Sequence, residues 1–120
     1  DRMTEAIGAL IAGAVGGMAE VFFAYPADWA KVPCVAYREA GNRTHARADG
    51  KEALKEVEYA IDVWSLSAEE MRSIADAVDE ALAGAGFRRA QAMDLFEEKT
   101  RYFRRAARYR ALSDGDRLYQ

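Results

Sequence analysis

The chain has 120 residues, of which 51% are hydrophobic and 31% are charged, and its formal net charge is −3. This length predicts one domain with a modest core, and the slightly acidic balance gives no global reason to expect a nucleic-acid or membrane partner. The single cysteine, Cys34, excludes an internal disulfide, and we expect a small buried hydrophobe rather than a reactive thiol.

Near the N-terminus, apolar residues recur at helical spacing, which predicts a short, partly buried helix. These residues are Met3, Ile7, Leu10, Ile11 and Ala14. Thr4 is a candidate cap, and Gly16-Gly17 ends the helix. The apolar run 6–19 is too short to cross a bilayer, and the acidic residues before it argue against a signal peptide.

Two strands and a polar loop follow. Residues 20–25 are rich in β-branched and aromatic side chains, and a second strand over 34–39 is closed by Gly41-Asn42. The segment 42–50 is polar and predicts a loop that contains the only histidine, His45. No second ligand stands at metal-binding spacing from it, so we expect a solvated residue without a metal or catalytic role.

The strongest strand signal is the alternation over 54–64. One face carries Val57, Tyr59, Ile61 and Val63, and the other carries Glu56, Glu58, Ala60, Asp62 and Trp64. The apolar face must be buried, whereas the mixed face meets water, a polar lumen or a partner. On that face, Trp64 is either an anchor for a protein contact or packed under the N-terminal helix.

An amphipathic helix follows this strand directly. Ser67-Ala68-Glu69-Glu70 matches a capping box, and Gly84 and Gly86 end the helix. Its apolar stripe consists of Met71, Ile74, Ala75, Val78, Ala81, Leu82 and Ala85. Because the connection is short, we expect this stripe to cover the apolar face of the strand.

The last third predicts two more strands and a tail. A weaker strand over 87–96 and a turn at 97–100 precede the segment 101–112, which fits both a strand and a helix. We favour the strand because it would pair antiparallel with the preceding one. Residues 113–120 predict a loosely ordered tail. The whole pattern predicts one α+β domain, with an antiparallel or mixed β-sheet and both helices packed on one face.

An arginine cluster marks the segment 101–112: Arg101, Arg104, Arg105, Arg108 and Arg110. With aromatic residues between them, these arginines suit nucleic acid, but no recognition helix or aromatic RNA motif is visible. We favour structural or subunit contacts, with acids of a neighbouring copy at Glu56, Glu58 and Asp62 or at Glu97 and Glu98. The sequence shows no catalytic motif, metal-ligand spacing or cofactor motif, so we expect no enzyme, no metal and no cofactor.

Two segments carry a family resemblance. Residues 33–42, Pro-Cys-Val-Ala-Tyr-Arg-Glu-Ala-Gly-Asn, precede a polar loop, and residues 59–65, Tyr-Ala-Ile-Asp-Val-Trp-Ser, lead into the central helix. In this order, with a late Tyr/Phe/Arg strand, they resemble the tail terminator (tail completion, or tail-to-head joining) proteins of long-tailed phages and phage-derived particles. The likeness spans about residues 3–112.

The resemblance implies a structural virion protein at the tail–head junction, assembled in the bacterial cytoplasm. It implies a homo-oligomeric ring, commonly of six copies, that caps the tail tube and meets the neck proteins, with DNA only passing through. Candidate contact residues are Arg43, His45, Arg47, Glu56, Glu58, Asp62, Trp64, Arg101, Arg104, Arg105 and Arg108. The alternatives are another neck protein, such as a connector or stopper, and a small nucleic-acid-binding domain that uses the Arg101–Arg110 cluster.

Overall fold

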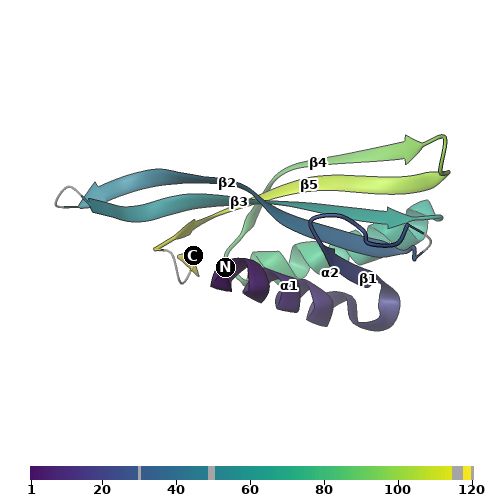
Figure 1. Ribbon diagram of the computed structural model, residues 1–120, viewed down its shortest axis with the longest axis horizontal. Helices are drawn as coiled ribbons and strands as arrows, with labels where there is room; N and C mark the ends of the chain where they lie inside the picture. Colours follow the sequence, from purple (N-terminus) through teal and green to yellow (C-terminus); the bar gives the residue numbers. More distant parts are fainter. Residues whose placement is uncertain (30, 49–50, 115–117, 120) are drawn as a thin grey trace.

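Figure 1 shows a computed structural model in which both helices lie on one face of a twisted sheet. The structure describes residues 1–29, 31–48, 51–114 and 118–119, with the side chains of 45–48, 51–53 and 119 left aside. The elements in chain order are α1 (Arg2–Val15), a 3₁₀ turn (Gly16–Met18), β1 (Glu20–Phe23), β2 (Cys34–Ala48), β3 (Lys51–Ser65), α2 (Ala68–Gly84), β4 (Arg88–Glu97), β5 (Tyr102–Ser113) and β6 (Leu118–Tyr119). The predicted α+β fold is confirmed.

The sheet is mixed, with the strand order β1-β2-β3-β5-β4 and β6 paired to β5. Only β1 and β2 are parallel; every other neighbouring pair is antiparallel. The segment 101–112, which fitted two patterns, is the strand β5, and it pairs with β4 as predicted. It also pairs with β3 over eleven positions, from Lys55↔Ser113 to Ser65↔Phe103. This pairing brings the late arginines beside the carboxylates of β3.

The polar loop predicted over residues 42–50 is wrong for its described part. Strand β2 runs on past Gly41 to Ala48, and its register shifts between Glu39 and Gly41 and again near Ala46. The resulting β2–β3 arm projects beyond the helices (Figure 1). No helix covers this arm, and the described side chains of residues 42–44 are exposed, so this part of the sequence lacks the alternation that marks a half-buried strand. His45 and Arg47 lie in β2, but their side chains are outside the described residues.

The core lies between the helices and the sheet. The predicted apolar face of β3 is confirmed: Val57, Tyr59, Ile61 and Val63 are all buried. The helices contribute Ile7, Ile11, Val15, Met71, Ile74, Ala75, Val78 and Leu82 to the same cluster. The central amphipathic helix therefore covers β3, as its stripe predicted, and α1 fills the rest of that face.

The start and the middle of α1 show how closely it packs. Asp1 caps the helix by accepting from the Thr4 amide at 2.8 Å, so Thr4 is not the cap. The Thr4 side chain instead hydrogen-bonds the Tyr59 hydroxyl at 2.7 Å. At Gly8, an added Cβ would overlap the end of the Tyr37 ring, so this glycine permits the close contact between α1 and β2. None of the described helices is long and apolar enough to span a bilayer.

The cap of α2 confirms part of the predicted capping box. The Ser67 hydroxyl accepts from the Glu70 amide at 3.2 Å. The Glu70 carboxylate, however, accepts from the buried Ser65 hydroxyl at 2.6 Å rather than from the Ser67 amide. The Ser65 oxygen in turn accepts from the Ser67 amide at 3.1 Å. The end of β3 and the start of α2 are thus tied together through Ser65.

Replacing Ser67 by Ala should lower the free energy of unfolding by about 1 kcal/mol, the usual cost of removing an N-cap side chain. Urea denaturation of the purified protein measures this difference. Ser73→Ala, an exposed site inside α2, is the matched control and should leave stability unchanged or slightly raised. Equal losses at both positions would contradict the role of the cap.

The C-terminal segment contributes a short strand. Leu118 and Tyr119 pair with Ser113 and Leu112 of β5. Ser113 is buried, and Leu118 packs at the edge of the main core. Within the segment 113–120, predicted as a loosely ordered tail, the structure thus places Ser113, Leu118 and Tyr119 on the sheet.

Candidate interface on the uncovered face of the sheet

The face of the sheet opposite the helices carries most of the candidate residues. We call it the open face; it comprises Arg38, Arg43, Glu56, Glu58, Ala60, Asp62, Arg88, Gln91, Met93, Leu95, Glu97, Arg104, Ala106, Arg108 and Arg110. The register places these side chains together because strand neighbours that are paired project to the same side. Their chemistry is dominated by guanidinium and carboxylate groups.

Glu58 and Asp62 are each held by arginines of the adjacent strand β5. One Glu58 carboxylate oxygen accepts from Arg108 at 2.8 Å and the other from Arg110 at 2.6 Å. Asp62 accepts from Nε and Nη2 of Arg104 at 3.3 and 3.1 Å. These contacts are the dominant polar feature of the open face.

Glu56 is contacted by arginines from strands on both sides of β3. It accepts from Nε of Arg43 on β2 at 3.1 Å, and Arg88 on β4 lies 3.6 Å from its other oxygen. Glu56, Glu58 and Asp62, which the sequence alone assigned to contacts with a neighbouring copy, are therefore paired within the chain. The physical reason is the β3–β5 pairing, which proximity along the sequence does not reveal.

The ion pairs shift the titration of the carboxyl groups. Hydrogen bonds from Arg110 and Arg108 hold the pKa of Glu58 below its usual value of 4.5. The hydrogen bond from Arg43 lowers the pKa of Glu56 in the same way. Both groups favour the folded state in their charged form.

Stability should therefore fall in acid. A carboxyl whose folded pKa is depressed contributes its full stabilisation above its unfolded pKa, and loses it as the pH falls through the folded value. We expect the melting temperature to be constant near pH 6–7 and to drop below about pH 4.5. In Glu58→Gln, this drop should be smaller than in the parent chain; an identical acid profile would contradict the role of Glu58.

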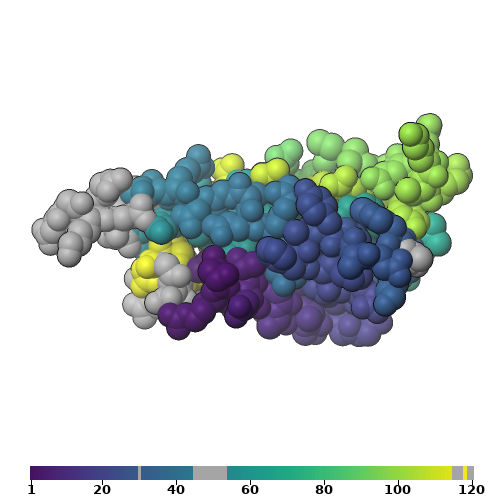
Figure 2. Space-filling model, viewed as in Figure 1, coloured from purple at the N-terminus to yellow at the C-terminus, as the bar shows by residue number. Residues whose placement is uncertain are grey.

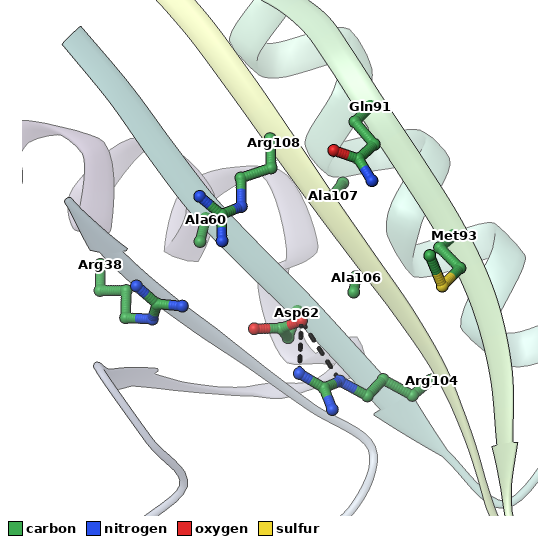
Figure 3. Close-up of a pocket in the computed structure, with 9 residues that line it drawn as sticks. All are labelled: Arg38, Ala60, Asp62, Gln91, Met93, Arg104, Ala106, Ala107 and Arg108. Carbon is green, nitrogen blue, oxygen red and sulfur yellow. Dashed lines mark hydrogen bonds and ion pairs between the residues drawn. The ribbon is translucent and has the colours of Figure 1, made fainter. Parts of the chain in front are cut away.

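Two alanines form the floor of a shallow depression on the open face. Ala60 and Ala106 line a cavity of about 210 Å³, together with Gln91 and Met93 of β4. Arg38 of β2 and Arg104 and Arg108 of β5 reach toward this space, and only Arg104 is engaged by Asp62 (Figure 3). Among the described residues, Arg38 has no ion-pair partner, so the depression is positively charged.

The arginine cluster does not form a single patch. Arg105 projects to the helix side, where it donates to both oxygens of Asp94 at 2.7 and 3.1 Å. Arg101 lies in the β4–β5 turn with a φ of 64°, and its guanidinium is 5.2 Å from the centre of the Phe96 ring. Only Arg104, Arg108 and Arg110 lie on the open face, because side chains alternate along β5.

Trp64 is covered within the chain, at one end of the open face. It is 3% exposed, and Trp29 packs against it edge-on, with ring centroids 5.1 Å apart. Trp29 belongs to the connection between β1 and β2, and its carbonyl accepts from the Tyr102 hydroxyl at 2.6 Å. Trp64 is thus neither an exposed anchor nor packed under α1. Beside it, Cys34 is fully buried, as predicted, and this burial raises the pKa of its thiol to about 11.

The match to a known family decides the identity of the chain. The family model described as tail completion protein gp17 matches residues 2–114. The chain belongs to this family. It is accordingly a structural protein of phage-type tails, and the resemblance predicted from residues 33–42 and 59–65 is confirmed.

Solved structures support the same fold for this member of the tail completion family. A chain in the virion of a native gene transfer agent particle is similar to it, with a TM-score of 0.63 and 22% sequence identity. The alignment covers 92% of the present chain and 84% of the other. No curated protein matches the chain in a sequence search. In the part of the chain that the structure describes, no group of acidic, histidine or cysteine side chains could hold a metal ion.

Sequence reasoning missed one feature of this tail completion protein, the two lateral edges of its sheet. Large apolar side chains are exposed at β4, namely Met93, Leu95 and Phe96, and at the β1 end, namely Phe23 and Tyr25. The sequence does hint at one of these edges. Strand β4 follows a helix, and β5 is the one strand pattern next to it in the chain, so a partner on its other side is not evident. Strand order, which determines the edges, is not readable from one sequence.

Proposed function

We propose that this tail completion protein forms a ring, of six copies, that caps the tail tube and joins the tail to the head. The observation that carries the proposal is the family match over residues 2–114. The elongated shape, 52 Å along its longest axis against 25 and 23 Å, suits a wedge in the wall of such a ring. The proposed partners are other copies of the chain, the tail tube protein and the connector proteins of the neck.

The open face supports a passive role toward DNA. It carries six arginines against the four acids Glu56, Glu58, Asp62 and Glu97, and the strongest contacts of these charges are with one another. Charges that are paired within the sheet attract phosphates weakly, so duplex DNA could pass such a surface without being retained. We propose that DNA is in transit through the ring, in a virion assembled in the host cytoplasm.

The experiment that tests the ring is a mass measurement by size-exclusion chromatography with light scattering. The purified chain is examined alone and with assembled tail tube, and electron microscopy locates it on the tube. We expect a closed oligomer at one end of each tube. A chain that stays monomeric and does not bind to tube ends would overturn the proposal.

A deletion in a particle-producing strain separates this role from those of other neck proteins. Without the chain, we expect filled heads and free tails of irregular length. A connector or stopper, by contrast, would leave tails of normal length and heads that leak DNA. Restoring the gene should restore joined particles.

A further inference from the structure

We propose that neighbouring copies join edge to edge, with β4 of one copy pairing antiparallel with β1 of the next. The inference deepens the proposed ring and rests on it. It names the contact that closes the ring, a continuous sheet that passes from subunit to subunit. Three observations carry it: unpaired strand edges, the directions of those strands, and the apolar side chains beside them.

Strands β4 and β1 end the sheet, and among the described residues each has a partner on one side only. Residues 88–96 of β4 are all exposed. Most natural edge strands are protected by lysine, proline or a bulge. The stretch 92–97 of β4 has none of these, since its only bulge lies between Arg89 and Gln91. Its unpaired N–H and C=O groups are available to another chain.

The two edges run in opposite directions. β2, β3, β5 and β4 alternate in direction, and β1 is parallel to β2, so β4 is antiparallel to β1. A rotation about an axis that follows the strands preserves strand direction from copy to copy. The β4 edge of one copy therefore meets the β1 edge of the next in the antiparallel sense, the more stable form of pairing. Such a contact is heterologous, as a ring requires.

Apolar side chains lie beside both edges at similar heights along the strands. Following the register across the sheet, Ala92 stands level with Ala107, Ile61, Tyr37 and Phe23. Met93 lies on the open face and is 49% exposed, whereas Phe23 lies on the helix side, as Ala92 does, and is 63% exposed. Burying these side chains together with those of Leu95 and Phe22 would add a hydrophobic contribution to the backbone ladder. Asp94, the one charge between Gln91 and Glu97, is already neutralised by Arg105.

The strand spacing gives the size of the ring that such a contact would form. Neighbouring strands lie about 4.8 Å apart, so six five-stranded sheets would make a wall about 45 Å across. Both helices would lie on one side of this wall and the open face on the other, because α1 and α2 cover the same face (Figure 1). In Figure 2, α1 (purple) lies along the lower side of the molecule, beneath β2. The helical layer is thicker than the sheet alone, so it suits the outer side of the ring, where the circumference is longer. The open face would then line the channel.

The first test places lysines on the β4 edge, in the double variant Met93→Lys and Leu95→Lys. Both positions are exposed, so the subunit should fold with its normal circular dichroism and melting curve. We expect the assembled fraction, measured by light scattering, to fall about tenfold or more, since edge lysines oppose strand addition. Leu66→Lys is the matched control, because Leu66 is 63% exposed in the β3–α2 connection, away from both edges. It should assemble normally.

The second test detects the contact directly by cross-linking. The double variant Phe22→Cys and Met93→Cys places one cysteine at each edge, level with each other on the open face. It is assembled and treated with a short bis-maleimide; native Cys34 is buried and should not react. A ladder of covalent oligomers, absent from either single variant, supports the proposal. Dimers from Met93→Cys alone would indicate β4–β4 pairing about a two-fold axis and overturn it.

The outcomes separate the edge contact from the ring itself. Rings that form and do not cross-link, or that tolerate both lysines, overturn the edge contact and leave the proposed function standing. If the parent chain forms no ring with or without tube, both fail. Loss of assembly in the lysine variant together with a covalent ladder in the cysteine variant supports both.

Discussion

Ile61→Asp should abolish cooperative unfolding, because the variant should not reach the native state. Ile61 lies on the apolar face of β3 and is 2% exposed, beneath the helices. The cation nearest in register on that side of the sheet, Arg105, is already bound to Asp94 and is not free to pair with a new carboxylate. Burying an unpaired charge costs more than about 5 kcal/mol, comparable to the whole stability of a small domain. Circular dichroism against temperature and urea measures the loss.

Leu66→Asp is the matched control for this experiment. It introduces the same carboxylate a few residues further along the chain, in the connection between β3 and α2, where Leu66 is exposed. This variant should melt within about 0.5 kcal/mol of the parent chain, as exposed substitutions usually do. A soluble, cooperatively melting Ile61→Asp protein would contradict the pairing of β3 with α2.

Reversing the charge of Arg104 should lower the free energy of unfolding by about 2–3 kcal/mol, between the values for exposed and fully buried ion pairs. Its partner Asp62 has a side chain only 13% exposed, so the loss leaves a poorly solvated carboxylate. Arg104→Glu also puts like charge near Glu97, which lies 3.7 Å from the present guanidinium. It removes the cation over the Trp64 ring as well. Urea denaturation measures the effect.

The swap Arg104→Glu with Asp62→Arg tests whether the pair itself is responsible. The double variant restores opposite charges across β3 and β5, and it should recover a large part of the stability that either single change loses. Additive losses would mean that the two residues act independently. Light scattering on the same variants separates this cost within the subunit from any effect on assembly.

Local signals explain which elements could be predicted. The stripe of α2 and the alternation of β3 are short-range patterns that a buried face imposes, and both are found as expected. The end of β2 was not predictable in the same way. Beyond Gly41 the strand continues without a core to face, so its residues resemble those of a loop.

The candidate site depends on long-range pairing, which explains what sequence reasoning missed. Glu58 and Arg110 are 52 residues apart, and only the β3–β5 register brings them together. The same register separates Arg105 from Arg104, although they are adjacent in the chain. The sequence singles out these charged residues, but their partners depend on the strand order, which one sequence does not contain.

Both tryptophans of the chain, Trp29 and Trp64, lie in one edge-on contact at a single corner of the molecule. Tryptophan fluorescence therefore comes from that corner alone and does not report events at the far arm. If the β1–β2 connection moves away from Trp64 when another protein binds there, the Trp64 ring becomes exposed to water and its emission shifts to longer wavelength. The chain thus contains its own optical reporter for that end of the sheet.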